Sequence, residues 1–501
     1  MSARSAVLIV GAGPCGLAAA VALRKRGVGV RIIDAADTPV TGSRALQLWP
    51  GALDVLRELD VLDEAERRGT RVTEMVYHLA GSTALRVRLG GVNEPLLLPQ
   101  EQTNEILEAR LESLGVRVER ALKVTDVART DGGVSVKAER PDGTSELLDA
   151  EWLIGADGVR STVREALGIG FPGEAVPSPF LIAEGRFDDS HAPGGVHYYF
   201  GRTGSLVFAP MHHGVARAGF PVPEDFEPSA EAVRRLLAER GATGMRLTEL
   251  TALSKFASHE RIAEHFVKGR CLLVGDAAHT HAAVGGQGLN LGLQDVRNLA
   301  WRLAGVLAGR LDPAVFSAYD TERRHAAAQT VRNTRQFVRL FTVPSWATGV
   351  RDGLWRALES AGVLRRWFAP LIAGRRIHYP RQAGARGPLR GTTRALALRA
   401  ARLARAGERT PPGLEAGAAE AGDALRLCVA GSGHGRLAER AREFAGEYPD
   451  LVTYRPLPGP ARGFVLLRPD GYVAASGTTP GELAAARGVL AALAKPRTPT
   501  G

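Results

Sequence analysis

The sequence predicts an α/β protein with three parts: a parallel sheet flanked by helices, an antiparallel sheet inserted into it, and a small α/β unit at the C-terminal end. Three observations support this prediction. Near the N-terminus an apolar run enters a glycine-rich turn and then a helix with apolar periodicity. Aromatic-rich runs of alternating polarity occupy the middle of the chain, and new strand and helix patterns follow a Gly-, Pro- and Arg-rich stretch near residue 400.

The size and composition of the chain are those of a folded protein with several domains. At 501 residues it is too long for one compact core, and its 45% hydrophobic and 23% charged residues are ordinary for globular proteins. No apolar run is long enough to span a bilayer, and the N-terminus reads as a strand and not as a secretory signal. The three cysteines, Cys15, Cys271 and Cys428, are far apart and form no CxxC pair. We therefore expect a cytoplasmic protein without disulfides, metal or membrane contact.

The positive net charge of +11 is unevenly distributed along the chain. Residues 1–320 hold 35 Lys+Arg and 40 Asp+Glu, whereas residues 321–501 hold 29 and 13. The basic part consists of arginines at helical spacing without interleaved aromatic residues, which favours solvated helix faces over a nucleic-acid site. We expect no nucleic-acid partner. An acidic partner or surface is the alternative interpretation.

Residues 6–34 predict a strand, a glycine turn, a helix and a second strand that ends at Asp34. Gly11-Ala12-Gly13-Pro14-Cys15-Gly16 is a GxGxxG sequence in the context that a Rossmann-like dinucleotide site requires, and Asp34 stands where a carboxylate accepts ribose hydroxyls. The glycines permit a tight turn and let backbone N–H groups approach a pyrophosphate. Cys15 lies at a helix N-terminus, where a thiol pKa falls, but it is also a small residue that fits a tight loop.

The remaining elements follow in order. Short strands from about 72 to 155 surround a helix near 101–114, and the strand Glu151–Ile154 meets Gly155-Ala156-Asp157-Gly158. A second apolar strand at 271–274 ends in Gly275-Asp276, and a helix with apolar periodicity begins near Gly286. The expected domains are a discontinuous cofactor domain, an antiparallel-sheet substrate domain, a linker and a C-terminal α/β domain. Their boundaries are 1–175 with 260–385, 176–259, 386–413 and 414–501.

These motifs resemble the three signatures of the class A flavoprotein aromatic hydroxylases. The matching segments are Gly11 to Gly16, Ala156-Asp157-Gly158-Val159-Arg160-Ser161, and Gly275-Asp276-Ala277-Ala278-His279 with Gly285 to Asn290. Their order and spacing also match. Ser43-Arg44-Ala45 and Leu98-Pro99-Gln100 are similar to family segments, and residues 414–501 resemble the thioredoxin-like tail of the phenol and polyketide hydroxylase branch, here without CxxC.

The resemblance implies FAD as the cofactor and a set of contacts to it. Asp276 would bond the ribityl hydroxyls, and the helix that opens near Gly286 would direct its positive end at the flavin N1/C2 edge. Arg160 and Arg164 are candidate phosphate partners. The cofactor-binding residues that we expect are Gly11, Ala12, Gly13, Pro14, Gly16, Asp34, Arg44, Gln100, Val124, Asp157, Gly158, Gly275, Asp276, Gly286, Gln287, Gly288, Leu289 and Asn290.

The resemblance further implies that NADPH or NADH reduces the flavin and that O2 then forms a C4a-hydroperoxide, which transfers an oxygen atom to an electron-rich ring. No second GxGxxG is present, so the nicotinamide nucleotide would bind transiently in a groove. The expected substrate is a polycyclic phenolic compound of the aromatic polyketide type. The residues that we expect to contact it come from the antiparallel sheet: His197, Tyr199, Phe208, Met211, His212 and Arg217. No residue is assigned as a catalytic base.

The sequence departs from the family at one place. The family has a His-Pro-Pro type of sequence after its GDAAH segment, whereas here Thr280-His281 is followed by Ala282-Ala283. Because proline fixes φ, its loss removes rigidity from a loop that faces the flavin. A Baeyer-Villiger or oxidative-rearrangement reaction on a related polyketide is therefore an alternative. A protein that sequesters a flavin or ligand without turnover is another, and the chain could be a monomer or a homodimer.

Overall fold

A computed structural model describes residues 5–39, 45–79, 84–176, 178–188, 194–201, 203–240, 245–282, 285–341, 348–380, 406–410, 422–430, 435–457 and 463–494. The chain forms two compact units. Unit 1 comprises Met1–Val296 and Ala327–Arg375, and unit 2 comprises Arg297–Ala326 and Arg376–Gly501. No helix in the described ranges is both long and apolar enough to cross a bilayer.

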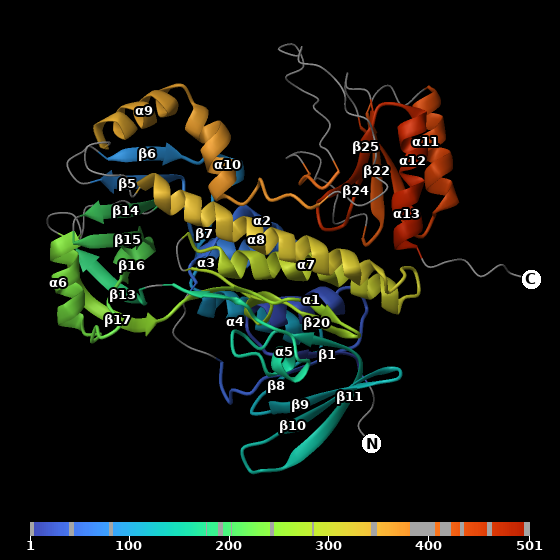
Figure 1. The fold of residues 1–501 in the computed structure, drawn as a ribbon, viewed down its shortest axis with the longest axis horizontal. Coiled ribbons are helices and arrows are strands. Elements are labelled where there is room, and N and C mark those ends of the chain that lie inside the picture. Colours follow the sequence, from blue (N-terminus) through green and yellow to red (C-terminus); the bar gives the residue numbers. More distant parts are fainter. Residues whose placement is uncertain are drawn as a thin grey trace, which may run out of the picture. The chain divides into compact units, whose positions relative to one another are not determined.

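The first sheet of unit 1 has eight strands, of which the central five run parallel in the order β20, β11, β1, β2, β8. Helices α1 (Pro14–Arg24) and α4 (Gln100–Ser113) belong to this layer (Figure 1). The strands are β1 (Ser5–Val10), β2 (Val30–Ile33), β8 (Val118–Glu119), β9 (Lys123–Thr130), β10 (Gly133–Glu139), β11 (Ser145–Gly155), β19 (Val267–Lys268) and β20 (Cys271–Leu273). The predicted parallel sheet is confirmed by the parallel pairing of these five strands, and its strands β1 and β20 are apolar and largely buried.

The second sheet of unit 1 has seven strands in the order β17-β13-β16-β15-β14-β5-β6. All neighbours are antiparallel except β14 and β5. The strands are β5 (Glu74–Leu79), β6 (Leu85–Arg88), β13 (Phe180–Asp188), β14 (Gly195–Gly201), β15 (Gly204–Pro210), β16 (Val215–Pro221) and β17 (Arg246–Phe256). The predicted antiparallel sheet is confirmed, but β5 and β6 add to it two strands from far upstream of residue 176.

Opposite faces of this seven-stranded sheet carry different helices. One face packs on α6 (Ala230–Arg240), and the other packs on α9 (Thr348–Ser360), the π-helix η5 (Leu364–Phe368) and α10 (Ala369–Ile372). Figure 1 shows α6 beside β13 and β15, and α9 and α10 beyond β5 and β6. Side chains that alternate along a strand therefore enter two separate cores.

Small sheets and short helices complete unit 1. They are β3 (Gln47–Leu48), β4 (Thr70–Arg71) and β7 (Leu96–Leu97) in one sheet, β12 (Gly173–Ala175), β18 (His259–Ile262) and β21 (His279–Thr280) in another, and the helices α2 (Pro50–Glu58), α3 (Leu62–Arg68), η1 (Gly91–Asn93), α5 (Thr162–Ala166), η2 (His212–Gly214) and η3 (Gly275–Ala277). Two long helices, α7 (Gly288–Leu307) and α8 (Val315–Phe341), each have residues in both units.

Unit 2 contains a four-stranded sheet in the order β23-β22-β24-β25, with a parallel β22–β23 pair and an antiparallel β24–β25 pair. Its elements are β22 (Leu425–Ala430), α11 (Arg436–Glu447), β23 (Val452–Leu457), β24 (Gly463–Leu467), β25 (Val473–Gly477), α12 (Pro480–Ala485) and α13 (Arg487–Leu493). The thioredoxin-like assignment of this unit stays a prediction. The expected linker at 386–413 lies outside the described residues except for 406–410.

A buried ion cluster joins the C-terminal sheet to α7 and α8 residues within unit 2. Arg468 donates from Nη1 and Nη2 to the two carboxylate oxygens of Glu322, at 2.6 and 2.8 Å, and Arg302 donates to Glu322 at 3.0 Å. Asn298 bridges Glu322 and Asp470 at 3.0 and 2.9 Å. Burial alone raises the pKa of Glu322, but Arg468 and Arg302 outweigh it and hold that pKa at about 2. The cluster is therefore paired and hydrogen-bonded, as buried charges must be.

We expect acid to weaken unit 2 through Glu322. Because the folded pKa lies below the ordinary carboxyl value, the stabilisation is complete above about pH 4.5 and is lost as the pH falls toward 2. Glu322→Gln should lower the free energy of unfolding by about 3–5 kcal/mol at pH 7 and remove this part of the acid dependence. Chemical denaturation at several pH values measures both effects.

Glu443→Gln is the matched control, because Glu443 pairs with Arg440 on the exposed face of α11. Its loss should change the free energy of unfolding by less than about 0.5 kcal/mol. Equal effects of the two substitutions would contradict a special role for the buried cluster.

Candidate cofactor and substrate site

The glycines of the loop between β1 and α1 differ in the space around them. Gly11 has φ +102°, and a Cβ there would lie 2.4 Å from the Ala156 carbonyl oxygen, so only glycine fits. A Cβ on Gly16 would lie 1.8 Å from the Gly11 oxygen. A Cβ on Gly13, by contrast, would have no protein atom within 4 Å. Since no side chain caps α1, its N-terminal turn presents backbone N–H groups to this open space, as an anion site requires.

Asp34 lies at the end of β2 against this loop. Its Oδ2 accepts from the Ala12 N–H at 2.5 Å, and its Oδ1 accepts from the Ala36 N–H at 2.8 Å. The carboxylate thus fixes the loop and remains partly exposed. The position is consistent with the predicted role of Asp34 beside a ribose.

The segment Asp157–Arg164 is held mainly by internal bonds. Asp157 accepts from Ser161 Oγ at 2.6 Å and from the Val163 N–H at 3.0 Å, and burial raises its pKa. Arg164 is 4% exposed and donates to the Ala277 and Val159 carbonyls, each at 3.0 Å. Arg164 therefore ties this loop to η3 and does not present a phosphate site, whereas Arg160 is exposed. Gly158 has open space where a Cβ would lie.

The turn after β20 brings Asp276 and Cys15 to one place. Asp276 is exposed, whereas Cys15 packs between Gly275 and Gly292, where a Cβ would lie 2.7 and 2.5 Å from its Sγ. Burial, with the charges of Asp295 and Asp276, raises the pKa of the Cys15 thiol well above its usual value. Cys15 is therefore the small packing residue and not a reactive thiolate.

Behind this turn, Asp295, His279 and His281 form a hydrogen-bonded chain. His279 Nε2 lies 2.6 Å from Asp295 Oδ2, and His281 Nε2 lies 3.2 Å from His279 Nδ1. Asp295 also accepts from the Gly275 N–H at 3.1 Å. Burial and the neighbouring His279 lower the pKa of His281 to about 3, so its ring is neutral at ordinary pH. Asp295 was not among the predicted site residues, although a carboxylate among the apolar positions of this helix marks a buried polar contact.

The start of α7 is fixed by side chains that were expected to contact the cofactor. Asn290 donates from Nδ2 to the carbonyls of Gln47 and Gly286, both at 2.7 Å, and accepts from the Trp49 N–H at 2.6 Å. Gln287 Nε2 donates to the Ile372 carbonyl at 3.0 Å. These two amides therefore shape the loop, and its backbone is the part free to face a ligand. A Cβ on Gly288 would again have no protein atom within 4 Å.

The remaining expected cofactor residues are dispersed. Gln100 bonds both backbone groups of Ala45. Its Oε1 accepts from the Ala45 N–H at 3.3 Å, and its backbone N–H donates to the Ala45 carbonyl at 3.1 Å. Arg44, next to Ala45, lies outside the described residues. Val124 is buried in β9, and Leu289 is half-buried in the first turn of α7.

The expected substrate residues fall on three different surfaces. His197 is buried and lies 3.0 Å from His78, while Tyr199 and Phe208 lie in the core under α6. Met211 lies in the opposite core, and His212 is exposed on η2. Arg217 pairs with Glu184 and donates to the Ala45 carbonyl at 3.2 Å, so it joins the seven-stranded sheet to the loop near Arg44. The structure does not bring these six residues together.

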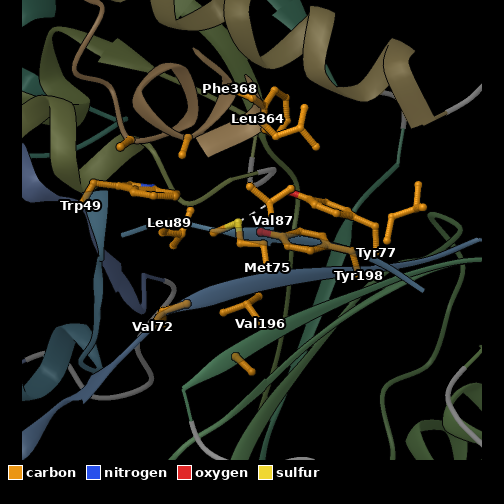
Figure 2. Close-up of a cluster of buried hydrophobic side chains, with 14 of the residues drawn as sticks. Trp49, Val72, Met75, Tyr77, Val87, Leu89, Val196, Tyr198, Leu364 and Phe368 are labelled. Carbon is orange, nitrogen blue, oxygen red and sulfur yellow. Dashed lines mark hydrogen bonds between the residues drawn. The ribbon is translucent and has the colours of Figure 1, made fainter. Parts of the chain in front are cut away.

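A buried apolar core reaches the α7 loop through Trp49. Trp49 Nε1 donates to the Gly285 carbonyl at 3.0 Å, and the Trp49 ring belongs to a buried cluster with Tyr77, Tyr198 and Trp355. Figure 2 shows Tyr77 and Tyr198 side by side with Met75, and Phe368 and Leu364 on the far side of the cluster. The two tyrosine rings stack with centroids 5.1 Å apart. We name these residues the aromatic cluster: Trp49, Met75, Tyr77, Tyr198, Met211, Trp355, Leu364 and Phe368.

Flavin dinucleotide fits the residues around these loops. Open space at Gly13, Gly158 and Gly288 would admit a ligand against backbone N–H groups. In the part of the chain that the structure describes, Thr280 Oγ1 and His281 Nδ1 are buried without a hydrogen-bond partner, next to the loop that leads to Gly285. Buried polar atoms of this kind call for a partner beyond the described residues, and a bound ligand can supply it.

Comparisons with known proteins agree with this geometry. The family model described as FAD binding domain matches residues 4–334. The 6-methylpretetramide 4-monooxygenase of Streptomyces rimosus is 32% identical over 95% of this chain and 91% of its own, and a rifampicin monooxygenase of Streptomyces venezuelae is 31% identical over 73% and 78%. The solved structure of the anhydrotetracycline hydroxylase OxyS from Streptomyces rimosus is 29% identical, with a TM-score of 0.72 over 95% of this chain and 96% of that one.

We expect Gly13→Ala to weaken FAD binding without unfolding the protein. The added methyl group meets no protein atom but fills space next to the N-terminus of α1. FAD affinity should fall by about tenfold or more, which corresponds to about 1.4 kcal/mol. A titration followed by flavin fluorescence measures the affinity.

Gly29→Ala is the control, since Gly29 is exposed in the same βαβ unit and its Cβ would also meet no protein atom. It should leave FAD affinity unchanged. If both variants bound FAD like the parent, the open space at Gly13 would not belong to the cofactor.

Proposed function

The chain belongs to the FAD binding domain family and is an FAD-dependent aromatic monooxygenase, and from this premise we propose that it inserts one oxygen atom from O2 into a polycyclic phenolic compound of the aromatic polyketide type, with NAD(P)H as the electron donor. Bound FAD supplies the redox chemistry in such a reaction. The protein binds, orients and shields. The observation that supports the substrate class is the aromatic cluster beside the α7 loop.

The cluster has the chemistry of a site for a large flat ring system. The eight named residues are buried side chains of a larger core whose other buried members are aliphatic, and all of the eight except Leu364 are aromatic or methionine. They offer stacking faces and adaptable apolar contacts. Trp355 lies edge-on to Tyr77 and to Phe368, with centroids 5.9 and 5.2 Å away. An apolar ligand held between such rings would exclude water from the reacting atoms.

The two tyrosines of the cluster are proposed as neutral contacts and not as bases. Burial raises the pKa of Tyr77 and of Tyr198 well above the usual value, so both hydroxyls keep their protons at working pH. Tyr77 directs its hydroxyl at the Met75 sulfur, 3.6 Å away. A neutral hydroxyl can donate a hydrogen bond to a phenolic or quinone oxygen and thereby orient the ring.

Three relatives or neighbours with polycyclic ligands in their names support the substrate class. The named compounds are 6-methylpretetramide, rifampicin and anhydrotetracycline. All three are large ring systems, and the chain covers most of each protein's length. The three compounds are those named for the similar proteins. For this chain the similarity favours a ligand of comparable size and aromatic character.

We expect polycyclic phenols to stimulate NAD(P)H oxidation by the FAD-loaded protein and to gain one oxygen atom. A panel of such phenols with anhydrotetracycline as one member, assayed by NADH and NADPH consumption and by product mass spectrometry, tests this. If no phenol of the panel increased NADH or NADPH consumption, the proposal would be contradicted. A ring-expanded ester would indicate the Baeyer-Villiger alternative, and ligand binding without NAD(P)H oxidation would indicate a sequestering protein.

We further expect neighbouring tyrosines of β14 to differ in effect, because they enter opposite cores. Tyr198→Leu should weaken ligand binding or kcat/KM by about tenfold, about 1.4 kcal/mol. Tyr199→Leu removes a ring that stacks on His78 at 4.1 Å and should lower the free energy of unfolding by about 1–3 kcal/mol without changing ligand preference. Ligand-induced changes in flavin absorbance and thermal unfolding separate the two effects. A change of ligand preference in Tyr199→Leu alone would place the substrate on the α6 face.

A further inference from the structure

Gln47 is a polar residue in an otherwise apolar buried run, Leu46-Gln47-Leu48-Trp49. It is 7% exposed and lies in β3, opposite Leu97 of β7. Its side-chain Nε2 is buried without a hydrogen-bond partner within the described part of the chain. A buried N–H group without an acceptor costs about 1–3 kcal/mol, so its retention calls for an acceptor that the described residues do not provide.

The protein acceptors along this run are already engaged. The Gly285 carbonyl accepts from Trp49 Nε1, and the Gly286 carbonyl accepts from Asn290 Nδ2. The Ala45 carbonyl accepts from Arg217 and from the Gln100 N–H. Asn290 also donates to the Gln47 carbonyl at 2.7 Å. This bond fixes the backbone of Gln47, so a backbone shift cannot move its side chain toward another acceptor.

The amide of Gln47 lies directly against the glycine loop that opens α7. Gly286 has φ +60°, and a Cβ there would lie 3.4 Å from the Gln47 Cβ and 3.8 Å from its Oε1. The glycines of this loop leave room for a ligand to approach its backbone. The amide that carries the unpartnered donor is therefore next to the loop at which we expect FAD to meet α7.

We propose that Gln47 Nε2 donates a hydrogen bond to the pyrimidine side of bound FAD. The isoalloxazine acceptors N1, O2 and O4 belong to the pyrimidine ring, and N5 lies in the adjacent central ring. A donor there stabilises the negative charge that the ring carries when reduced, and so raises its reduction potential. The inference rests on FAD binding and is independent of the proposed substrate.

The test compares Gln47→Met and Gln47→Glu in the FAD-loaded protein, with the midpoint potential and visible spectrum of the flavin as readouts. Methionine keeps the volume but cannot donate. We expect a fivefold to tenfold selective loss of affinity for reduced over oxidised flavin, which corresponds to a potential lower by about 20–30 mV for a two-electron couple. An ionised glutamate adds negative charge and should lower the potential further.

At low pH the glutamate variant should recover the flavin potential of the parent protein. Once protonated, its carboxyl group is a donor of nearly the same shape as the amide, so the potential of Gln47→Glu should approach that of the parent protein as the pH falls. This comparison remains available if the methionine variant folds poorly. If the side chain at position 47 were remote from the flavin, Gln47→Glu would show no such pH dependence.

Asn93→Leu is the matched control. Asn93 is also buried, but its Nδ2 donates to the Leu89 carbonyl at 3.0 Å. Its loss should lower the thermal unfolding temperature and leave the flavin potential unchanged. The proposal is overturned if Gln47→Met and Gln47→Glu have the parent's potential and spectrum, whether or not any phenol is turned over.

Discussion

The side-chain amide of Asn290 makes three hydrogen bonds on which the arrangement of the site depends. Through them the first turn of α7 holds the Gln47 carbonyl, the Trp49 N–H and the Gly286 carbonyl at 2.6–2.7 Å. Trp49 then binds the Gly285 carbonyl through its indole. One amide thus fixes β3 of the small three-stranded sheet, the backbone of Trp49 and the glycine loop. Because each partner is backbone or a rigid ring, the backbone groups of the loop can be presented to a ligand with little reorganisation.

The polar residues of α7 serve a similar purpose further along the helix. Asp295, in unit 1, accepts from His279 and from the Gly275 N–H, and so fixes the turn that carries Asp276. Asn298, in unit 2, bridges Glu322 and Asp470. Each is fully buried and would be costly without its partners. The helix therefore combines an apolar packing surface with a few directional bonds that specify the position of its neighbours.

Residue alternation along the seven-stranded sheet separates stability from ligand contact. Tyr198 faces the aromatic cluster, whereas Tyr199 packs under α6. A pattern of alternating residues shows that the sheet has two faces but does not tell which helices will cover each face. The helices α9 and α10, from more than 130 residues downstream, close one face and so define the proposed substrate surface. In the proposed function the buried tyrosines would orient the ligand, and the cofactor would supply the reactive group.

The sequence by itself determined the local parts of this protein. Apolar runs, glycine turns and helical periodicity placed β1, α1, β20 and the start of α7 to within a few residues, since these signals arise from neighbouring positions. The strand predicted at Glu151–Ile154 is only the end of β11, which begins at Ser145. The motifs likewise indicated an FAD site, and the matching family agrees. Tertiary structure alone decided which side chains face a ligand: Asn290, Gln287 and Arg164 satisfy backbone groups, while Gln47 and Trp49, which no motif marks, lie beside the α7 loop. Hydrogen-bond partners more than 200 residues apart are set by packing, and no local pattern records them.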